Sequence, residues 1–275
     1  VLMEYEGLNV MFDSGIKLTE PPTYPKPVED LDVAFLSHAH LDHCGNLPAV
    51  HRRHRMPIYA HEVTFELSHM LQKDSIKIDK LKGYPLKYTE KDIARMVVGE
   101  IHVKNDKSYR FHDRFDFTFY DAGHIPGSAG IYIEGGDKSV FYSGDTNIRD
   151  TRLLNGAQYP DQCDVVIFES TYGNREHPDR RDVENRFLEE VKSTIERGGT
   201  ALIPVFAIGR TQEVLLLLEE LDYPVFLTAW RRRPRRPYSG SPTRSRTTAN
   251  CRRQWTTPHG SRAGEIGRGS QRIPT

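Results

Sequence analysis

The chain has 275 residues, of which 37% are hydrophobic and 28% are charged, and its 38 basic and 38 acidic residues cancel. A chain of this length can bury one large core or two smaller ones. Its apolar runs, such as Val214–Leu218, are too short to cross a membrane, so we expect no membrane association. Three cysteines at irregular spacing argue against a disulfide framework. Together with the lack of a signal-peptide pattern at the start, they predict a cytoplasmic protein.

The neutral total charge conceals two unlike parts. Residues 229–275 hold 12 of the 38 basic residues, all of them arginine, and a single acidic residue, Glu265. Residues 1–228 therefore hold 26 basic and 37 acidic residues, a net charge of −11. The last 47 residues contain no Lys, Leu, Val, Phe, Met or Asp, so they cannot build a core. They can be interpreted as a nucleic-acid-binding tail, as a disordered tail, or as a stretch translated out of frame.

The pattern of apolar residues predicts an α/β chain. Alternation at the start favours two strands, 1–5 and 8–12, joined by a turn at Glu6-Gly7 and followed by a proline-rich loop over 14–30. Further strands are expected at 31–37, 58–60, 100–104, 115–120, 130–134, 138–142, 164–169, 201–207 and 225–227. A hairpin turn is expected at Gly135-Gly136-Asp137. Helices are expected at 46–55, 62–73, 89–97, 181–197 and 211–221.

The strongest chemical signal is the run Ser37-His38-Ala39-His40-Leu41-Asp42-His43, directly after a predicted buried strand. His38 and His40 are two residues apart, so on an extended backbone their side chains point the same way. Asp42 and His43 open the next helix and can face a second point. Nitrogen and oxygen ligands arranged in this way suit two neighbouring metal ions. A histidine-rich surface loop is the alternative.

Two later segments offer further ligands at strand ends. His124 follows a predicted strand in Asp121-Ala122-Gly123-His124, where small residues leave room for an ion and a substrate. Asp145 follows another in Ser143-Gly144-Asp145-Thr146. A carboxylate at this place could bridge two metal ions through its two oxygens. Each segment alone is equally compatible with a turn, but together with the His38–His43 run they predict a two-metal site.

These motifs, in this order, resemble the metallo-β-lactamase fold. Two further stretches, Phe168–Gly173 and Ile203–Glu213, resemble its β-CASP branch of nucleic-acid nucleases. The amino-acid sequence of these motifs is most similar to that of the archaeal and eukaryotic cleavage and polyadenylation specificity factor nucleases. The ribonuclease J group is related to them. The resemblance covers residues 1 to about 227. It implies an αββα sandwich with the start of an inserted β-CASP α/β domain.

The resemblance also implies a role for each motif residue. One zinc ion would be held by His38, His40 and His124, and a second by Asp42 and His43, with Asp145 bridging both. Asp13 would orient the cluster. The catalytic residues would be Asp42, Asp145 and Glu169, of which Glu169 partners a histidine that protonates the leaving group. Arg210 and Thr211, at a helix N-terminus, would meet substrate phosphate, although Thr211 is equally compatible with simple helix capping.

The chain departs from the family after Leu227. The family typically continues Asp-Gly-Met, whereas this chain reads Thr228-Ala229-Trp230. Loss of one G from codons for the family's residues reproduces that change, so we expect the following residues to be out of frame. Two histidines that the family supplies later are not recognisable, which predicts an incomplete second zinc site and impaired activity. The expected parts are 1–172, the first segment of the lactamase domain; 173–227, the beginning of the β-CASP domain; and 228–275, an out-of-frame or disordered arginine-rich tail.

The resemblance predicts a zinc-dependent ribonuclease, endonucleolytic or 5′–3′ exonucleolytic, of RNA 3′-end processing, transcription termination or decay. RNA is the expected partner, and the full-length family member can form a homodimer. A thioesterase or a DNA nuclease of the same fold is the first alternative, and the Phe168–Gly173 and Ile203–Glu213 stretches argue against the thioesterase. A non-catalytic RNA-processing subunit is the second, although all six expected metal ligands are present.

Overall fold

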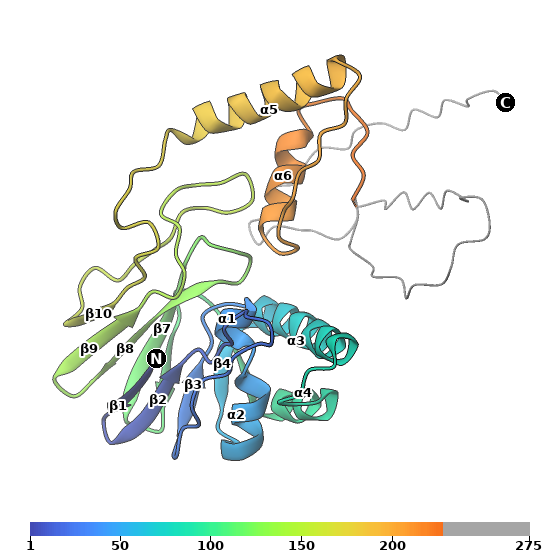
Figure 1. Cartoon of the computed structure of the whole chain (residues 1–275). Helices are drawn as coiled ribbons and strands as arrows, with labels where there is room; N and C mark the ends of the chain where they lie inside the picture. The colour runs from blue at the N-terminus through green and yellow to red at the C-terminus, as the bar shows by residue number, and fades with distance from the viewer. Residues whose placement is uncertain (228–275) are drawn as a thin grey trace, which may run out of the picture. The chain divides into compact units, whose positions relative to one another are not determined.

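The computed structural model describes residues 1–227, and Val1–Asp222 form one compact unit. Residues from Tyr223 onward belong to a second unit, of which 223–227 are described. The expected out-of-frame or disordered tail, residues 228–275, lies outside the described residues. The first unit contains two five-stranded sheets and the helices labelled in Figure 1. None of the helices within residues 1–227 has both the length and the apolar character needed to cross a membrane.

The first sheet follows the chain from one edge to the other. Its strands, side by side in this order, are β1 (Leu2–Tyr5), β2 (Leu8–Phe12), β3 (Val33–Phe35), β4 (Ile58–His61) and β5 (Glu100–Val103). β1 and β2 form the predicted antiparallel hairpin, because Glu6 and Gly7 adopt the positive φ angles, 50° and 72°, that suit a two-residue turn. The pairs from β2 to β5 are parallel, so these strands end at the same edge of the sheet.

The second sheet has the order β10-β9-β8-β7-β6. Its strands are β6 (Ser108–Phe111), β7 (Phe115–Asp121), β8 (Ala129–Gly135), β9 (Lys138–Tyr142) and β10 (Val165–Ile167). Gly135 pairs with Lys138 across the predicted hairpin turn. β10 runs parallel to β9, and the other pairs are antiparallel. The sequence pattern missed β6, because only two of its four residues, Tyr109 and Phe111, are apolar.

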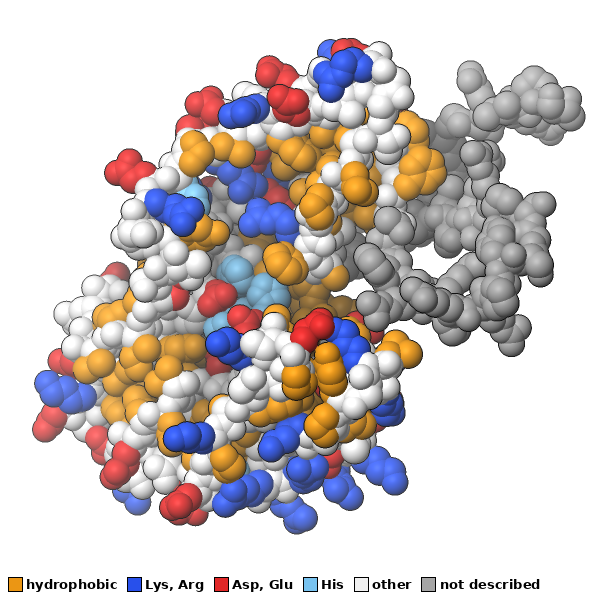
Figure 2. Space-filling view, in the orientation of Figure 1, with side chains coloured by type: hydrophobic (Ala, Val, Ile, Leu, Met, Phe, Trp, Pro, Cys, Tyr) orange, Lys and Arg blue, Asp and Glu red, His pale blue; other side chains and the backbone are white. Residues whose placement is uncertain are grey.

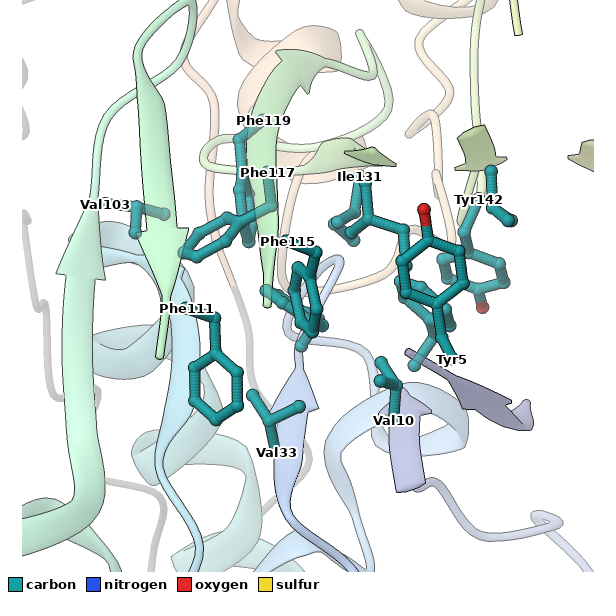
Figure 3. Close-up of a cluster of buried hydrophobic side chains, with 14 of the residues drawn as sticks. Tyr5, Val10, Val33, Val103, Phe111, Phe115, Phe117, Phe119, Ile131 and Tyr142 are labelled. Atoms are coloured by element: carbon teal, nitrogen blue, oxygen red, sulfur yellow. The ribbon is translucent and has the colours of Figure 1, made fainter. Parts of the chain in front are cut away.

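The main hydrophobic core lies between the two sheets (Figure 3). Phe12 and Phe35 of the first sheet stack with their ring centroids 5.6 Å apart, and Phe35 meets Phe117 of the second sheet edge-on at 5.0 Å. All three side chains are fully buried. Burial of a phenylalanine of this kind stabilises a fold by about 1.5–3 kcal/mol relative to exposure. The alternation of apolar residues along the strands thus holds the two sheets face to face.

Helices cover the other face of the first sheet. They are α1 (Leu41–Cys44), α2 (Leu47–His54), α3 (Glu62–Lys82) and α4 (Glu90–Met96), the last followed by a short 3₁₀ turn, Val97–Gly99. A second buried cluster joins them to the sheet through Ala34, Ile58, Leu47, Phe65 and Met96. α3 extends beyond the predicted 62–73, because Ile76 is buried against Tyr88 and Ile93 and because Gly83, with φ 73°, ends the helix.

The later part of the chain differs from the expected alternation of strands and helices. The helices are present as α5 (Arg180–Glu196) and α6 (Arg210–Leu218). The predictions of strands at 201–207 and 225–227 were wrong, since both segments are irregular and Leu202, Phe206 and Phe226 are more than 80% exposed. A strand needs a neighbour to pair its backbone groups, and within residues 1–227 no strand pairs with either segment.

Candidate metal centre

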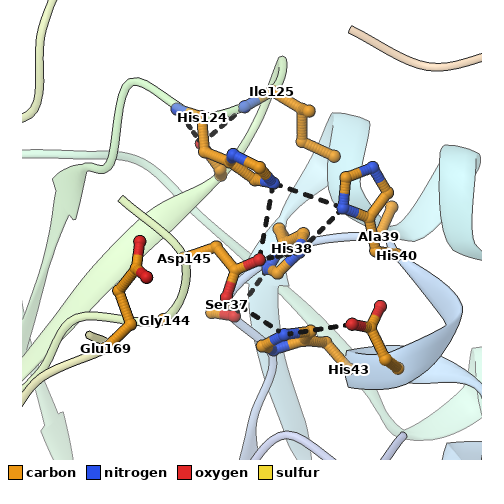
Figure 4. Close-up of polar contacts among 12 residues, drawn as sticks. Ser37, His38, Ala39, His40, His43, His124, Ile125, Gly144, Asp145 and Glu169 are labelled. Carbon is orange, nitrogen blue, oxygen red and sulfur yellow. Dashed lines mark hydrogen bonds and ion pairs between the residues drawn. The ribbon is translucent and has the colours of Figure 1, made fainter. Parts of the chain in front are cut away.

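The residues expected to bind metal lie at the ends of strands from both sheets (Figure 4). Asp13 follows β2, the His38–His43 run follows β3, His124 lies between β7 and β8, and Asp145 follows β9. β2 and β3 are parallel neighbours, so the segments after them leave the first sheet at one edge. Backbone hydrogen bonds then join Asp13 N to Phe35 O and Ala129 N to Ser37 O, which links the two sheets beside the cluster. Figure 2 shows the histidine side chains gathered near the centre of one face, with acidic side chains beside them.

Two glycines allow these segments to approach closely. A Cβ atom on Gly15 would lie 1.6 Å from the Asp42 carbonyl oxygen. The loop containing Gly15 is hydrogen-bonded to the histidine run, with Ser14 N donating to His43 O at 2.7 Å. Gly144, which precedes Asp145, has a φ of 55°, and a Cβ there would lie 2.7 Å from the Ser37 Cβ. Larger residues at these two positions would separate the strand ends that carry the ligands.

Four potential ligand atoms, one each from His38, His40, His124 and Asp145, converge on one point. His40 Nδ1 lies 3.2 Å from both His38 Nε2 and His124 Nε2. Asp145 Oδ2 lies 3.6 Å from His124 Nε2 and 3.8 Å from His38 Nε2. Ligands about 2.0–2.1 Å from a tetrahedral zinc ion are separated by about 3.3 Å. The donor types and their spacing therefore fit a zinc-like ion.

The second carboxylate oxygen of Asp145 faces a different histidine. Asp145 Oδ1 lies 3.2 Å from His43 Nε2, and Asp42 Oδ2 lies 4.0 Å from the same nitrogen. Asp145 consequently faces two groups of ligands at once. The side chain of Asp42 is 55% exposed. Asp42 and His43 also line a cavity of about 340 Å³ on the side of Asp13 and Lys26, and Asp145 is not part of its lining.

Asp13 is enclosed by hydrogen-bond donors. Its Oδ2 accepts from His43 Nδ1 at 2.7 Å, from Ser37 Oγ at 2.6 Å and from the Tyr142 hydroxyl at 2.8 Å, while its Oδ1 accepts from Ser37 N at 2.7 Å. Distance alone also groups Asp13 with His38 and His43 as potential ligands. Because four donors already occupy its oxygens, we interpret Asp13 as the residue that orients His43 rather than as a ligand.

The histidines of the cluster differ in charge. Burial lowers the pKa of His38, His40 and His124, and for His38 the neighbouring histidines lower it further. Burial also acts to lower the pKa of His43, but its hydrogen bonds to Asp13 and Asp145 raise it to about 10. The hydrogen bond from His43 in turn lowers the pKa of Asp145. Three imidazoles are thus neutral and ready to bind metal at neutral pH, and the fourth must release a proton.

Glu169 is held beside the cluster by the backbone. Its Oε1 accepts from Thr146 N at 3.2 Å and its Oε2 from Thr171 N at 3.0 Å. Its own backbone N donates to Ser143 Oγ at 3.2 Å. Thr146 follows Asp145 directly, and Figure 4 shows the Glu169 carboxylate on the side of Asp145 away from His43 and His40.

Arg210 and Thr211 begin α6, as the sequence indicated. The Thr211 hydroxyl donates to the Phe206 carbonyl, and its backbone N donates to the same oxygen at 3.1 Å. The backbone N of Arg210 donates to Ile208 O at 3.0 Å. These amides serve the local turn, whereas the Arg210 side chain is exposed. The expected phosphate contact of both residues stays a prediction.

Sequence reasoning missed one member of the site, Tyr142. The last residue of β9, it is buried between the sheets and stacks on Phe12 with a centroid distance of 5.0 Å. Alternation along β9 places Tyr142 on the same face as buried Val140, which was a usable signal. The hydroxyl's partner, Asp13, is 129 residues away in the chain, so only the folded structure reveals the contact.

Two facing sheets with a histidine and aspartate cluster at their strand ends define a metal-binding α/β protein. Residues 1–225 match the family model of the metallo-beta-lactamase superfamily, and the chain belongs to this superfamily, as its motifs predicted. Members of the superfamily bind metal ions, and His38, His40, His124 and Asp145 form a group that could hold one.

Among similar proteins is "Probable RNase MJ4" of Methanocaldococcus jannaschii, 41% identical in a 229-residue alignment that covers 79% of this chain and 53% of that protein. "Transcription termination factor FttA" of the same organism is 37% identical over 79% of this chain and 37% of its own length. "Cleavage and polyadenylation specificity factor 73" of Drosophila melanogaster is 35% identical over 80% of this chain and 33% of its own length. The chain therefore spans about half or less of these curated relatives.

Proposed function

We propose that this chain carries the metal centre of a zinc-dependent ribonuclease that hydrolyses phosphodiester bonds in RNA 3′-end processing, transcription termination or decay. The observation that carries the proposal is the ligand group His38, His40, His124 and Asp145, at spacings that fit zinc, with Asp145 also facing His43. The names of the similar proteins, an RNase, a termination factor and a cleavage factor, favour RNA as the substrate.

In this proposal His38, His40 and His124 would hold one zinc ion and Asp42 and His43 a second, while Asp145, whose two oxygens face both groups, would contribute to each. When bound, two ions make a water molecule acidic enough to attack at neutral pH and neutralise charge that develops on the phosphate. The chain's own side chains supply the rest. Asp13 holds the imidazole of His43 by its Nδ1, which leaves Nε2 directed at Asp145 and the second position.

Glu169 and Arg210 act around this centre. Glu169 is fixed by two backbone amides beside Asp145, so its charge is available to orient a proton donor for the leaving oxygen. The exposed Arg210 guanidinium, next to Thr211 at the start of α6, is available to the substrate phosphate. We assign Asp42, His43 and Asp145 to the second position because both carboxylates face His43 Nε2. As the family resemblance implies, we propose that this position is incomplete and that turnover is slow.

The experiment compares metal content and cleavage by the whole purified chain. We expect about one tightly bound zinc ion per chain, and slow cleavage of an RNA oligonucleotide that is lost in His124→Ala and Asp145→Ala. His54→Ala is the matched control, because the His54 side chain lies outside the cluster. A chain that binds no zinc, or whose RNA cleavage survives both substitutions, would contradict the proposal.

The same assay separates the alternatives. Preferential cleavage of a DNA oligonucleotide, or of a thioester, would favour another hydrolase of this superfamily. RNA binding without any cleavage would favour a non-catalytic RNA-processing subunit.

We further propose a cytoplasmic protein and, for longer relatives, a homodimer. The free state of the two described cysteines, Cys44 and Cys163, is consistent with the first.

A further inference from the structure

The segment that leads into α6 contacts the metal-ligand loops directly. Ile208 is 7% exposed and packs in one buried cluster with Ala39 and Ile125. Ala39 lies between two of the histidine ligands, and Ile125 follows His124. Gly209 has a φ of 77°, and a Cβ on it would lie 2.7 Å from the Ile125 Cγ2. The chain therefore turns at Gly209, where it packs against the loops that carry His40 and His124.

A second contact from the same segment reaches the loop that follows Asp145. Glu213 is only 5% exposed, although it lies in the first turn of α6. Its two carboxylate oxygens accept hydrogen bonds from consecutive backbone amides, Arg152 N and Leu153 N, both at 2.9 Å. A carboxylate near a helix N-terminus is usually exposed and interacts with its own helix. Glu213 instead binds a loop that lies about 60 residues earlier in the chain.

Two arginines balance the buried charge. Arg180 of α5 forms an ion pair with Glu213 and donates to Glu184 Oε1 at 2.5 Å. Arg152 donates to Glu184 Oε2 at 2.9 Å. Glu184 is 7% exposed, so Glu184 and Glu213 are both nearly inaccessible to water, whereas Glu220, which also pairs with Arg152, is 45% exposed. Buried carboxylates are tolerated when they are paired in this way, and removal of one partner leaves an uncompensated charge.

The loop held by Glu213 is joined in turn to the loop of His124. Asn147 N donates to Ala122 O, Ala157 N to Asn147 O, and Gln158 N to Asp121 O, each at 2.8 Å. The loop therefore starts next to Asp145, is fixed in its middle by Glu213, and ends on the segment that carries His124. A displacement at its middle would be transmitted to both ligands.

We propose that Ile208 and Glu213 are positioning residues that brace the metal ligands, Ile208 from the side of the histidine loops and Glu213 through the loop after Asp145. This inference rests on the proposed metal centre. It assigns to the Ile203–Glu213 motif the positioning of the metal ligands, in addition to the proposed contact with substrate. The brace holds the donor atoms at metal-binding spacing, so the affinity for metal depends on side chains that do not touch it.

The test measures the affinity of the whole chain for zinc and cobalt(II) by competition with a chromophoric chelator. Glu213→Gln and Ile208→Ala should each weaken the tight site about tenfold, the lower end of the loss seen when groups behind a ligand are removed. The absorption bands of bound cobalt(II) should also shift, since they report ligand geometry. The matched controls are Glu189→Gln, at an exposed position of α5, and Leu202→Ala, whose side chain is 86% exposed.

A second measurement needs no variant and covers the case in which a variant fails to fold. Coupling between two sites is reciprocal, so if the brace strengthens metal binding about tenfold, metal must strengthen the brace by the same factor. Hydrogen exchange at the Arg152 and Leu153 amides of the wild-type chain should slow about tenfold when zinc is added. Unchanged metal affinity in folded Glu213→Gln and Ile208→Ala variants, or unchanged exchange at these amides, would refute the positioning role of Ile208 and Glu213. It would leave the proposed metal centre in place. A wild-type chain without metal affinity overturns the metal centre as well.

Discussion

Replacing Asp13 by asparagine is the most informative single change in the site. Asparagine has the same shape as aspartate but carries no charge, and it offers one acceptor oxygen in place of two. In the wild-type chain the two oxygens of Asp13 accept from Ser37 N, Ser37 Oγ, His43 Nδ1 and the Tyr142 hydroxyl. The amide nitrogen of the variant would face Ser37 N if it replaced Oδ1, or the other three donors if it replaced Oδ2, so between one and three donors would lose their acceptor.

The size of the effect follows from these contacts. A buried donor left without an acceptor costs about 1–3 kcal/mol. For one to three such donors, with partial relaxation of the hydroxyl groups, we expect a decrease of about 3 kcal/mol in the free energy of unfolding of the metal-free chain. Since Asp13 also holds the imidazole of His43 in place, the second metal position should weaken by about 10–100-fold.

Urea unfolding of the metal-free chain and a cobalt(II) titration measure the two quantities. Asp30→Asn is the matched control, because Asp30 is exposed. A change below about 1 kcal/mol in Asp13→Asn, with unchanged metal affinity, would refute our reading of Asp13 as the organiser of the cluster.

Three further predictions follow from the same contacts. Tyr142→Phe removes one hydrogen bond to Asp13 without loss of volume, and urea unfolding should show a decrease of about 1–2 kcal/mol. Gly144→Ala places a Cβ 2.7 Å from the Ser37 Cβ at a φ of 55°, so zinc competition should show weaker binding at the tight site, and unchanged affinity would contradict the role of this glycine. Because the pKa of His43 is raised to about 10, metal must displace its proton. Affinity at the second position should therefore rise about tenfold per pH unit between about pH 7 and 10, as measured by titration, and should rise less steeply in Asp13→Asn.

The spacing of His38 and His40 already predicted that the two side chains point the same way, and the alternation of apolar residues predicted most of the strands of both sheets. These are local properties, because the periods of the strand and the helix are imposed by backbone geometry on every residue in turn. The sequence also predicted that His124 and Asp145 join the histidine run, since each follows an apolar strand. In the structure β7 and β9 both run antiparallel to β8, so they end at the same edge. The superfamily resemblance added the assignment of each ligand.

The sequence pattern predicted strands at 201–207 and 225–227, and the structure has none there. An apolar run indicates only that a segment is suited to a β-strand. The strand forms when a neighbouring strand is present to pair with its backbone. β6 is the opposite case, because its few apolar residues predicted nothing and its pairing with β7 created the strand. The hydrogen bonds from the Arg152 and Leu153 amides to Glu213 could not be predicted from the sequence either. A glutamate in the first turn of a helix is expected to be a favourable surface charge.

The sequence by itself therefore determined the ligand types, their order and the elements that carry them, because those depend on residue chemistry and short-range periodicity. Only the tertiary structure decided which carboxylate oxygen faces which histidine, that the Tyr142 hydroxyl donates to Asp13, and that Ile208 packs against Ala39 and Ile125. Such contacts join residues that are far apart in the chain, and their partners are selected by how the two sheets and the later helices pack, which no local pattern encodes.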